Sequence, residues 1–243
     1  MVQKTEQWEL VFASGKDAAR LLEGQLTCSV ADLPLNDPQL MAICNVQGRV
    51  IVSGFVHREE EGYGLWVPAG EGKHALAVLE KYGVFFQVEL VLLAVETKQA
   101  VFALLAPKHE QCVARGWVCV TGAVAEQWTP GDLDYITLGA VSLDKGCYIG
   151  QEIIARMHYR GQSKNRLVWF HCKPDRVVPV GGVLCSDDEA GGHIKAGQVL
   201  SSYEEMPGQC RGLAIVKKQV IENEQSLVFV SSEAVVPVEY AIT

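Results

Sequence analysis

The 243-residue sequence lacks the long apolar runs and the nucleophile motifs that mark several protein classes. Its longest apolar runs, such as LVLLAV at residues 90–95, fall far short of the roughly 20 residues that a membrane span needs. The opening MVQKTEQWEL has no apolar segment behind a basic start, so we expect no secretory signal, no membrane association and a cytoplasmic location. G-x-S-x-G, H-E-x-x-H and P-loop motifs are absent, which argues against hydrolases.

Closely spaced cysteines are also absent. The chain has eight cysteines, at positions 28, 44, 112, 119, 147, 172, 185 and 210, and no C-x-x-C pair. Zinc and iron-sulfur sites use thiolates that lie close together in the sequence, so the spacing predicts no resident metal site. We expect most of these cysteines to be small buried hydrophobic residues that stay reduced.

The composition is that of a globular protein, with 49% hydrophobic and 21% charged residues. The net charge of -8 argues against a surface that binds nucleic acid directly. Residues 145–176 depart from this balance, with seven Lys or Arg against two acidic residues. This segment is either an anion-binding patch or a solvated basic face, and composition does not separate the two.

Periodicity predicts a mixed α/β chain in several segments. Residues 8–30 read as a strand, a turn and a helix that begins near Lys16, and residues 40–70 alternate as strands do. A helix is predicted at about 72–82, and a short helix near 108–115 precedes a strand ending near Val120. Short strands at regular spacing in 166–243 indicate a small β-barrel or sandwich.

The stretch KGCYIGQE, residues 145–152 and hereafter the signature segment, places Cys147 in a glycine-bracketed loop. Good helix formers follow from Gln151 to Tyr159, so the loop lies just ahead of a helix N-terminus. The positive end of the helix and the charge of Lys145 both favour a thiolate, which would make Cys147 a reactive thiol. The alternative is a buried cysteine that packs the turn.

Polar side chains recur along the helix that follows. Glu152, Arg156 and Arg160 are spaced by four residues and therefore share one helical face. They form either a surface ladder of ion pairs or one wall of an anion site, and spacing does not decide between these.

The signature segment, followed by ARMHYRG, resembles the K-G-C-[YF]-x-G-Q-E motif of the YgfZ family. Weaker similarity continues through ASGKDAARLLEGQLTCSV, CNVQGRV, LEKYGVFFQV and GLAIVKK, so the resemblance covers most of the chain. YgfZ proteins bind folate, are related to the T-protein (aminomethyltransferase) of the glycine cleavage system, and are implicated in iron-sulfur cluster assembly and repair.

The resemblance implies an α+β, aminomethyltransferase-like ring of domains with a C-terminal β-barrel. It places a discontinuous folate-binding domain at 1–40 and about 106–165, a shortened ferredoxin-like domain at about 41–105, and the barrel at 166–243. The region before the signature segment is short for this family, which indicates a trimmed middle domain and an altered folate pocket.

The resemblance also implies site residues. Cys147 and Lys145 would form the functional thiol site, with Cys147 a transient ligand of a cluster shared with a partner. Tetrahydrofolate would be the cofactor, and its implied contacts are Gly146, Tyr148, Gly150, Gln151, Glu152, Arg156 and Arg160.

Two other functions stay open. T-proteins carry an Asp pair after an N-x-x-G turn, but the matching positions in NVQGRVIVSG are Val52 and Ser53, which cannot act as acid or base near neutral pH. A one-carbon transferase is therefore less favoured, and a scaffold without folate binding is the second alternative. The favoured function is a monomeric folate-binding factor for iron-sulfur clients or cluster-assembly proteins, which would also support tRNA modification.

Overall fold

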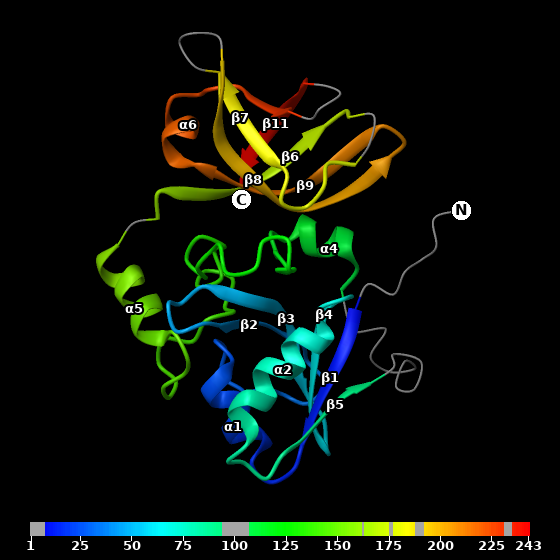
Figure 1. The fold of residues 1–243 in the computed structure, drawn as a ribbon, viewed down its shortest axis with the longest axis vertical. Helices are drawn as coiled ribbons and strands as arrows, with labels where there is room; N and C mark the ends of the chain where they lie inside the picture. The colour runs from blue at the N-terminus through cyan, green and yellow to red at the C-terminus, as the bar shows by residue number, and fades with distance from the viewer. Residues whose placement is uncertain (1–7, 94–106, 162, 175–176, 188–191, 231–234) are drawn as a thin grey trace. The chain divides into compact units, whose positions relative to one another are not determined.

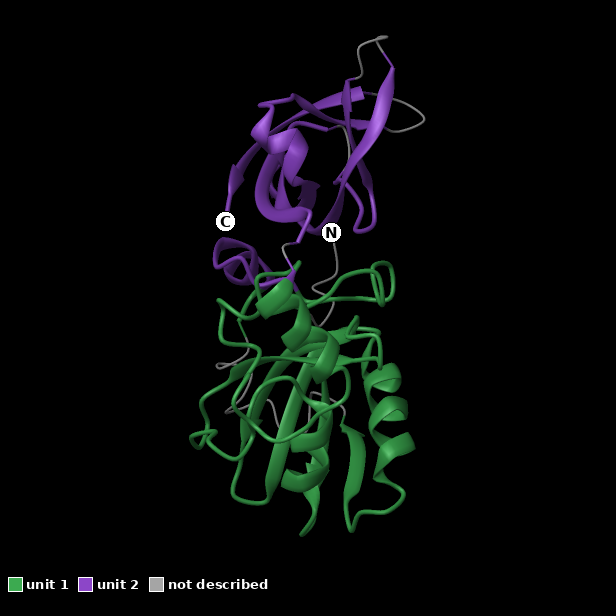
Figure 2. Ribbon diagram, turned by 90° about the vertical axis from the view of Figure 1, so that its left-hand side faces the viewer, with its two compact units in different colours: residues 1–108, 119–160 green, residues 109–118, 161–243 purple. Residues whose placement is uncertain are grey.

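A computed structural model describes residues 8–93, 107–161, 163–174, 177–187, 192–230 and 235–243 (Figure 1). The chain is mixed α/β and divides into two compact units (Figure 2). Unit 1 is Met1–Lys108 with Cys119–Arg160, and unit 2 is His109–Val118 with Gly161–Thr243. Within the described ranges, no helix combines the length and the apolarity needed to cross a membrane.

Unit 1 is built on a five-stranded antiparallel sheet. Its elements are β1 (Trp8–Ser14), α1 (Ala18–Gln25), β2 (Gln39–Cys44), β3 (Val50–Arg58), β4 (Gly62–Pro68), α2 (Gly72–Gly83), β5 (Glu89–Leu93) and α5 (Gln151–Arg160). The strands lie in the order β2-β3-β4-β1-β5, so the first strand of the chain runs between β4 and β5. The strands and helices predicted over 8–82 are confirmed, although α1 begins at Ala18 and not at Lys16.

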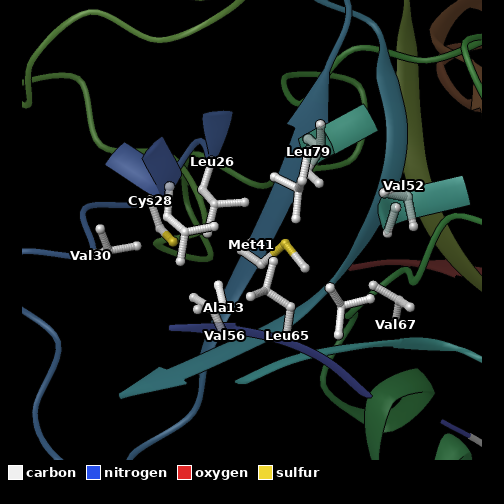
Figure 3. Close-up of a cluster of buried hydrophobic side chains, with 14 of the residues drawn as sticks. Ala13, Leu26, Cys28, Val30, Met41, Val52, Val56, Leu65, Val67 and Leu79 are labelled. Carbon is white, nitrogen blue, oxygen red and sulfur yellow. The ribbon is translucent and has the colours of Figure 1, made fainter. Parts of the chain in front are cut away.

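Helices α1 and α2 cover one face of this sheet. Figure 3 shows the apolar layer between these helices and the sheet. Leu26 and Leu79 contribute to it from the helical side, and Met41 and Val52 contribute from the strands. These four side chains are fully buried, and removing the apolar surface of such residues from water is the main favourable contribution to folding.

An irregular segment that includes Val120 and Tyr135 packs on the opposite face of the sheet. Side chains alternate along β3, so Val52 enters the helix-covered layer while Ser53 faces the other way. Ser53 Oγ accepts hydrogen bonds from Val120 N and from the Tyr135 hydroxyl, each at 2.7 Å. The predicted strand ending near Val120 is wrong, because here the backbone N–H bonds a side chain and the residues around it form no ladder.

Unit 2 is a closed six-stranded barrel with two short helices. Its elements are α4 (His109–Ala114), β6 (Asn165–Cys172), β7 (Val183–Asp187), β8 (His193–Met206), β9 (Gln209–Lys217), α6 (Lys218–Glu222), β10 (Leu227–Val230) and β11 (Val235–Ile242). The strand order is β10-β11-β6-β9-β8-β7, which confirms the predicted C-terminal barrel and the short helix near 108–115. Trp169 Nε1 donates to Val113 O at 2.7 Å and ties α4 to β6.

The domain boundaries expected from the family resemblance divide unit 1 differently. Residues 1–40 and about 41–105 were assigned to separate domains, yet β1 from the first range pairs with β4 from the second, with Leu10 opposite Trp66. Both ranges therefore contribute to one sheet. Residues 94–106, at the end of the second range, lie outside the described residues. The barrel strands run from Asn165 to Ile242, and unit 2 also includes His109–Val118.

Candidate functional site

The signature segment forms a loop that leads directly into α5. The helix runs over Gln151–Arg160, as predicted, and its ladder opens with Ile154 N donating to Gly150 O at 3.1 Å. Cys147 lies in the loop just before the helix and is the one exposed residue among the eight cysteines, all of which are described and free. The thiol is therefore presented to solvent and is not a packing group of the turn.

The end of the loop is pressed against the turn between β2 and β3. Gly150 has φ +84°, and a Cβ there would lie 2.7 Å from Asn45 O and 3.0 Å from Gly48 Cα. Gly48 has φ +70°, and a Cβ added there would lie 3.2 Å from side-chain atoms of Ile153 and Ile154 in α5. Gly146 has open space around its Cα and no positive φ. Of the two glycines that bracket Cys147, only Gly150 is required by the packing.

Lys145 anchors the start of the signature segment to the loop after α1. Its Nζ donates to Leu26 O at 3.0 Å and to Cys28 O at 2.7 Å, and lies 3.3 Å from Glu23 Oε1. The side chain is 2% exposed. Burial lowers the pKa of Lys145, while the nearby Glu23 carboxylate opposes that shift. The expected role of Lys145 in activating Cys147 stays a prediction, since these contacts hold the ammonium in place on the α1 side.

Backbone bonds complete the attachment of this segment to unit 1. Ile149 N donates to Gly24 O at 3.2 Å, and Ser142 N donates to Thr27 O at 2.9 Å. The Thr27 hydroxyl, which is fully buried, donates to Ala140 O at 2.6 Å. The loop that carries Cys147 is thus held on both sides while its tip remains exposed.

Two buried polar atoms lie close in sequence to the Ile149–Gly24 bond. Tyr148 is 6% exposed and Gln25 is 6% exposed. Among the described residues, neither the Tyr148 hydroxyl nor Gln25 Oε1 has a hydrogen-bond partner. Burial raises the pKa of Tyr148, so the hydroxyl keeps its proton and remains a donor at neutral pH. Gln25 was not predicted as a site residue.

The polar face of α5 is exposed. Glu152, Arg156 and Arg160 are all accessible to solvent, and no ion pair joins them within the part of the chain that the structure describes. A ladder of ion pairs is therefore not formed, and two guanidinium groups stand free on one helix. Gln151 instead serves the loop, because its Nε2 donates to Lys145 O at 3.4 Å.

The positions that would carry the transferase carboxylates belong to the core. Val52 and Ser53 are both fully buried. The Val52 side chain packs in the apolar layer beneath the helices. Ser53 accepts the two hydrogen bonds from Val120 N and the Tyr135 hydroxyl. Neither side chain is placed to exchange a proton with a ligand.

A pocket lies outside the signature segment, and no metal-binding cluster lies within the described regions. A pocket of about 540 Å³ in unit 2 lies beside α4 and is lined partly by Trp169, Tyr203 and Arg211, with no residue from the signature segment. Across the described ranges, no group of three or more His, Cys, Asp or Glu side chains could hold a metal ion.

Sequence reasoning found the loop and helix but not their anchors. Glu23 fixes Lys145 and also accepts from Val30 N at 2.8 Å through its Oε2. Nothing in the sequence around Glu23 distinguishes it from an exposed helix residue. The Asn45–Gly48 turn was visible as a turn, but not as the surface on which Gly150 rests.

No family model matches the chain. The chain is 22% identical to the tRNA-modifying protein YgfZ of Vibrio atlanticus, over 93% of this chain and 86% of the relative. It is 27% identical to the tRNA-modifying protein YgfZ of Serratia proteamaculans, over 71% of each. The first of these alignments extends over 283 positions, more than the 243 residues of this chain, so the relative contains insertions that this chain lacks.

The fold is that of an aminomethyltransferase. The structure of the glycine cleavage system aminomethyltransferase T from Bartonella henselae matches with a TM-score of 0.70. The match covers 97% of this chain and 83% of the other, at 14% sequence identity. The α+β, aminomethyltransferase-like fold expected from the resemblance is confirmed.

Proposed function

The chain is a relative of the YgfZ proteins with the fold of a T-protein, and from that premise we propose that it binds tetrahydrofolate and supports iron-sulfur cluster assembly or repair through Cys147. The observation that carries the proposal is the exposed Cys147 at the tip of a loop that is otherwise fixed by buried contacts. Such a thiol is accessible to a partner protein without unfolding of the chain.

The residues around the signature segment fit a folate. The buried Tyr148 hydroxyl can donate a hydrogen bond and the Gln25 amide oxygen can accept one, and leaving such groups without a partner costs about 1–3 kcal/mol each. The free guanidinium groups of Arg156 and Arg160 suit the anionic glutamate tail. Gly150 fixes the end of the loop, Gly146 leaves open space beside Cys147, and Glu152 lies in the first turn of α5.

A bound folate would supply one-carbon chemistry. The chain's own residues would position the ligand and keep the thiol exposed. Lys145 holds the loop against α1, Gln151 closes it, and Cys147 provides a sulfur that can ligate or exchange a cluster held jointly with a client or assembly protein. We propose that these steps take place in the cytoplasm and that they support tRNA modification, the activity in the names of the relatives.

Aminomethyl transfer is the less favoured function. Transferase chemistry needs a group that exchanges protons near the bound folate, and both matching positions are buried in apolar or fully bonded surroundings. A scaffold without folate binding is the other alternative, and it predicts no response to folate in solution.

The proposal is tested in a strain that lacks its own YgfZ protein. Expression of the full chain should restore the activity of iron-sulfur enzymes, and calorimetry of the purified chain should show one tetrahydrofolate per molecule. Rescue without folate binding would support the scaffold, and binding without rescue would leave a folate protein of another function.

A further inference from the structure

Cys172 and Cys210 face each other in the wall of the unit 2 barrel. Cys172 is the last residue of β6, Cys210 is the second residue of β9, and the two are direct partners in the antiparallel register. The eight pairs from Asn165 opposite Lys217 to this one contain no bulge. Opposite residues in such a ladder have Cα atoms about 4.5–5.5 Å apart, within the range of about 4.4–6.8 Å that a disulfide spans.

The two thiols already interact. The Cys210 Sγ donates to Arg211 O at 3.9 Å while it carries its proton, and the Cys172 thiol stands opposite it in the ladder. The neighbouring Cys172 thiol, helped by the Val178 backbone, lowers the pKa of Cys210 to about 7, against burial and the nearby Glu204 carboxylate, which both act to raise it. The Cys210 side chain and burial raise the pKa of Cys172. Of the two thiols, Cys210 therefore ionises more readily than Cys172.

The other buried cysteines differ from this pair. Burial raises the pKa of Cys28 to about 12, and burial also raises the pKa of Cys44. Cys185, in the same barrel, stands opposite Lys195 and has no thiol across the ladder. Only the Cys172–Cys210 pair, among the described residues, combines a facing partner with a stabilised thiolate.

The pair is buried but lies at a strand end. Cys172 and Cys210 are 3% and 1% exposed. The β8–β9 turn begins immediately beyond Cys210, where Met206 pairs with Gln209. Strand ends open locally at a lower free energy than the whole barrel, and such opening is the route by which a small reagent would reach the pair.

We propose that Cys172 and Cys210 form a redox site that reacts with low-molecular-weight disulfides to give an intramolecular disulfide. The Cys210 thiolate attacks one sulfur of the small disulfide, which forms a mixed disulfide and releases one small thiolate. Cys172 then loses its proton to solvent and attacks the Cys210 sulfur, which releases the second small thiolate. The protein loses two hydrogens, the disulfide is reduced to two thiols, and a dithiol reductant reverses the reaction.

This site is separate from Cys147, so its test does not depend on the proposed function. The full chain carrying Cys147→Ser is incubated with oxidised glutathione, quenched with acid, alkylated and mapped by mass spectrometry. The expected result is a mass loss of two hydrogens, two glutathiones released per chain, and a peptide that links Cys172 to Cys210. Dithiothreitol should restore both thiols, and the rate should rise with pH through an inflection near 7.

Single variants separate the two roles. Cys172→Ser should stop at one glutathione on Cys210, and Cys210→Ser should slow uptake at Cys172 by more than about tenfold because the thiolate is lost. Cys185→Ser is the matched control and should leave the cross-link unchanged. Recovery of Cys172 and Cys210 as free thiols, or as mixed disulfides only, would overturn the proposal, and this outcome is read from the Cys147→Ser chain even if a barrel variant does not fold.

Discussion

The Lys145 ammonium lies 3.3 Å from the Glu23 carboxylate and bonds two backbone carbonyls beyond it, so the first residue of the signature segment is locked onto the loop after α1. The lysine is buried, while Cys147, two residues later, is exposed. The signature segment therefore has a fixed first residue and an accessible tip.

Replacing Lys145 by Ala should destabilise unit 1 by about 2–3 kcal/mol, because it leaves the Leu26 and Cys28 carbonyls and Glu23 without their partner. Urea unfolding of the variant measures the change. Lys164→Ala, at an exposed position, is the control and should shift stability by less than about 0.5 kcal/mol. Equal stability of the two variants would show that the buried lysine is not an anchor.

The two glycines around Cys147 should respond differently to alanine. Gly150→Ala forces an L-residue to φ +84° and places a Cβ 2.7 Å from Asn45 O, so a loss of about 2 kcal/mol or more is expected. Gly146→Ala meets no atom within 4 Å and should be nearly neutral. Thermal unfolding compares them. If Gly146→Ala proved the more damaging, the described contact between α5 and the β2–β3 turn would be incorrect.

Folate affinity should depend on the exposed arginines of α5. The double change Arg156→Ala and Arg160→Ala removes two free cations and should weaken tetrahydrofolate binding by about tenfold, with a smaller deficit at high salt. Calorimetry at two ionic strengths measures both effects. Lys16→Ala with Arg58→Ala, a pair of exposed cations beside the start of α1, is the charge-matched control. An equal loss of tetrahydrofolate affinity in both double variants would show that the effect comes from net charge alone.

Cys147 should be alkylated fastest of the eight cysteines in the native chain. It is the exposed one, Cys119 is intermediate and the other six are buried. Timed alkylation with iodoacetamide followed by peptide mapping ranks the rates. A Cys147 that is alkylated more slowly than a buried cysteine would mean that the loop shields the thiol in solution.

Local pattern was enough to predict much of the fold and part of the site. The barrel, the α1 and α2 helices and the helix from Gln151 were readable because their periodicity and turn residues agree with the final packing. The strand expected near Val120 failed because the Ser53 side chain, 67 residues away, takes its backbone N–H. Glu23 was missed for the same reason, because its contact with Lys145 is long-range, and Gln25 was missed because no spacing rule predicts its burial.

We propose that Cys147 is a functional thiol on a loop that folds without it. The most direct measurement is rescue of iron-sulfur enzyme activity by Cys147→Ala in a strain lacking its own YgfZ protein. This variant should fold, keep an unfolding free energy within about 0.5 kcal/mol of the parent and bind tetrahydrofolate equally well, because only an exposed side chain is lost. It should nevertheless give no rescue. Full rescue by a stably folded Cys147→Ala chain would contradict this proposal.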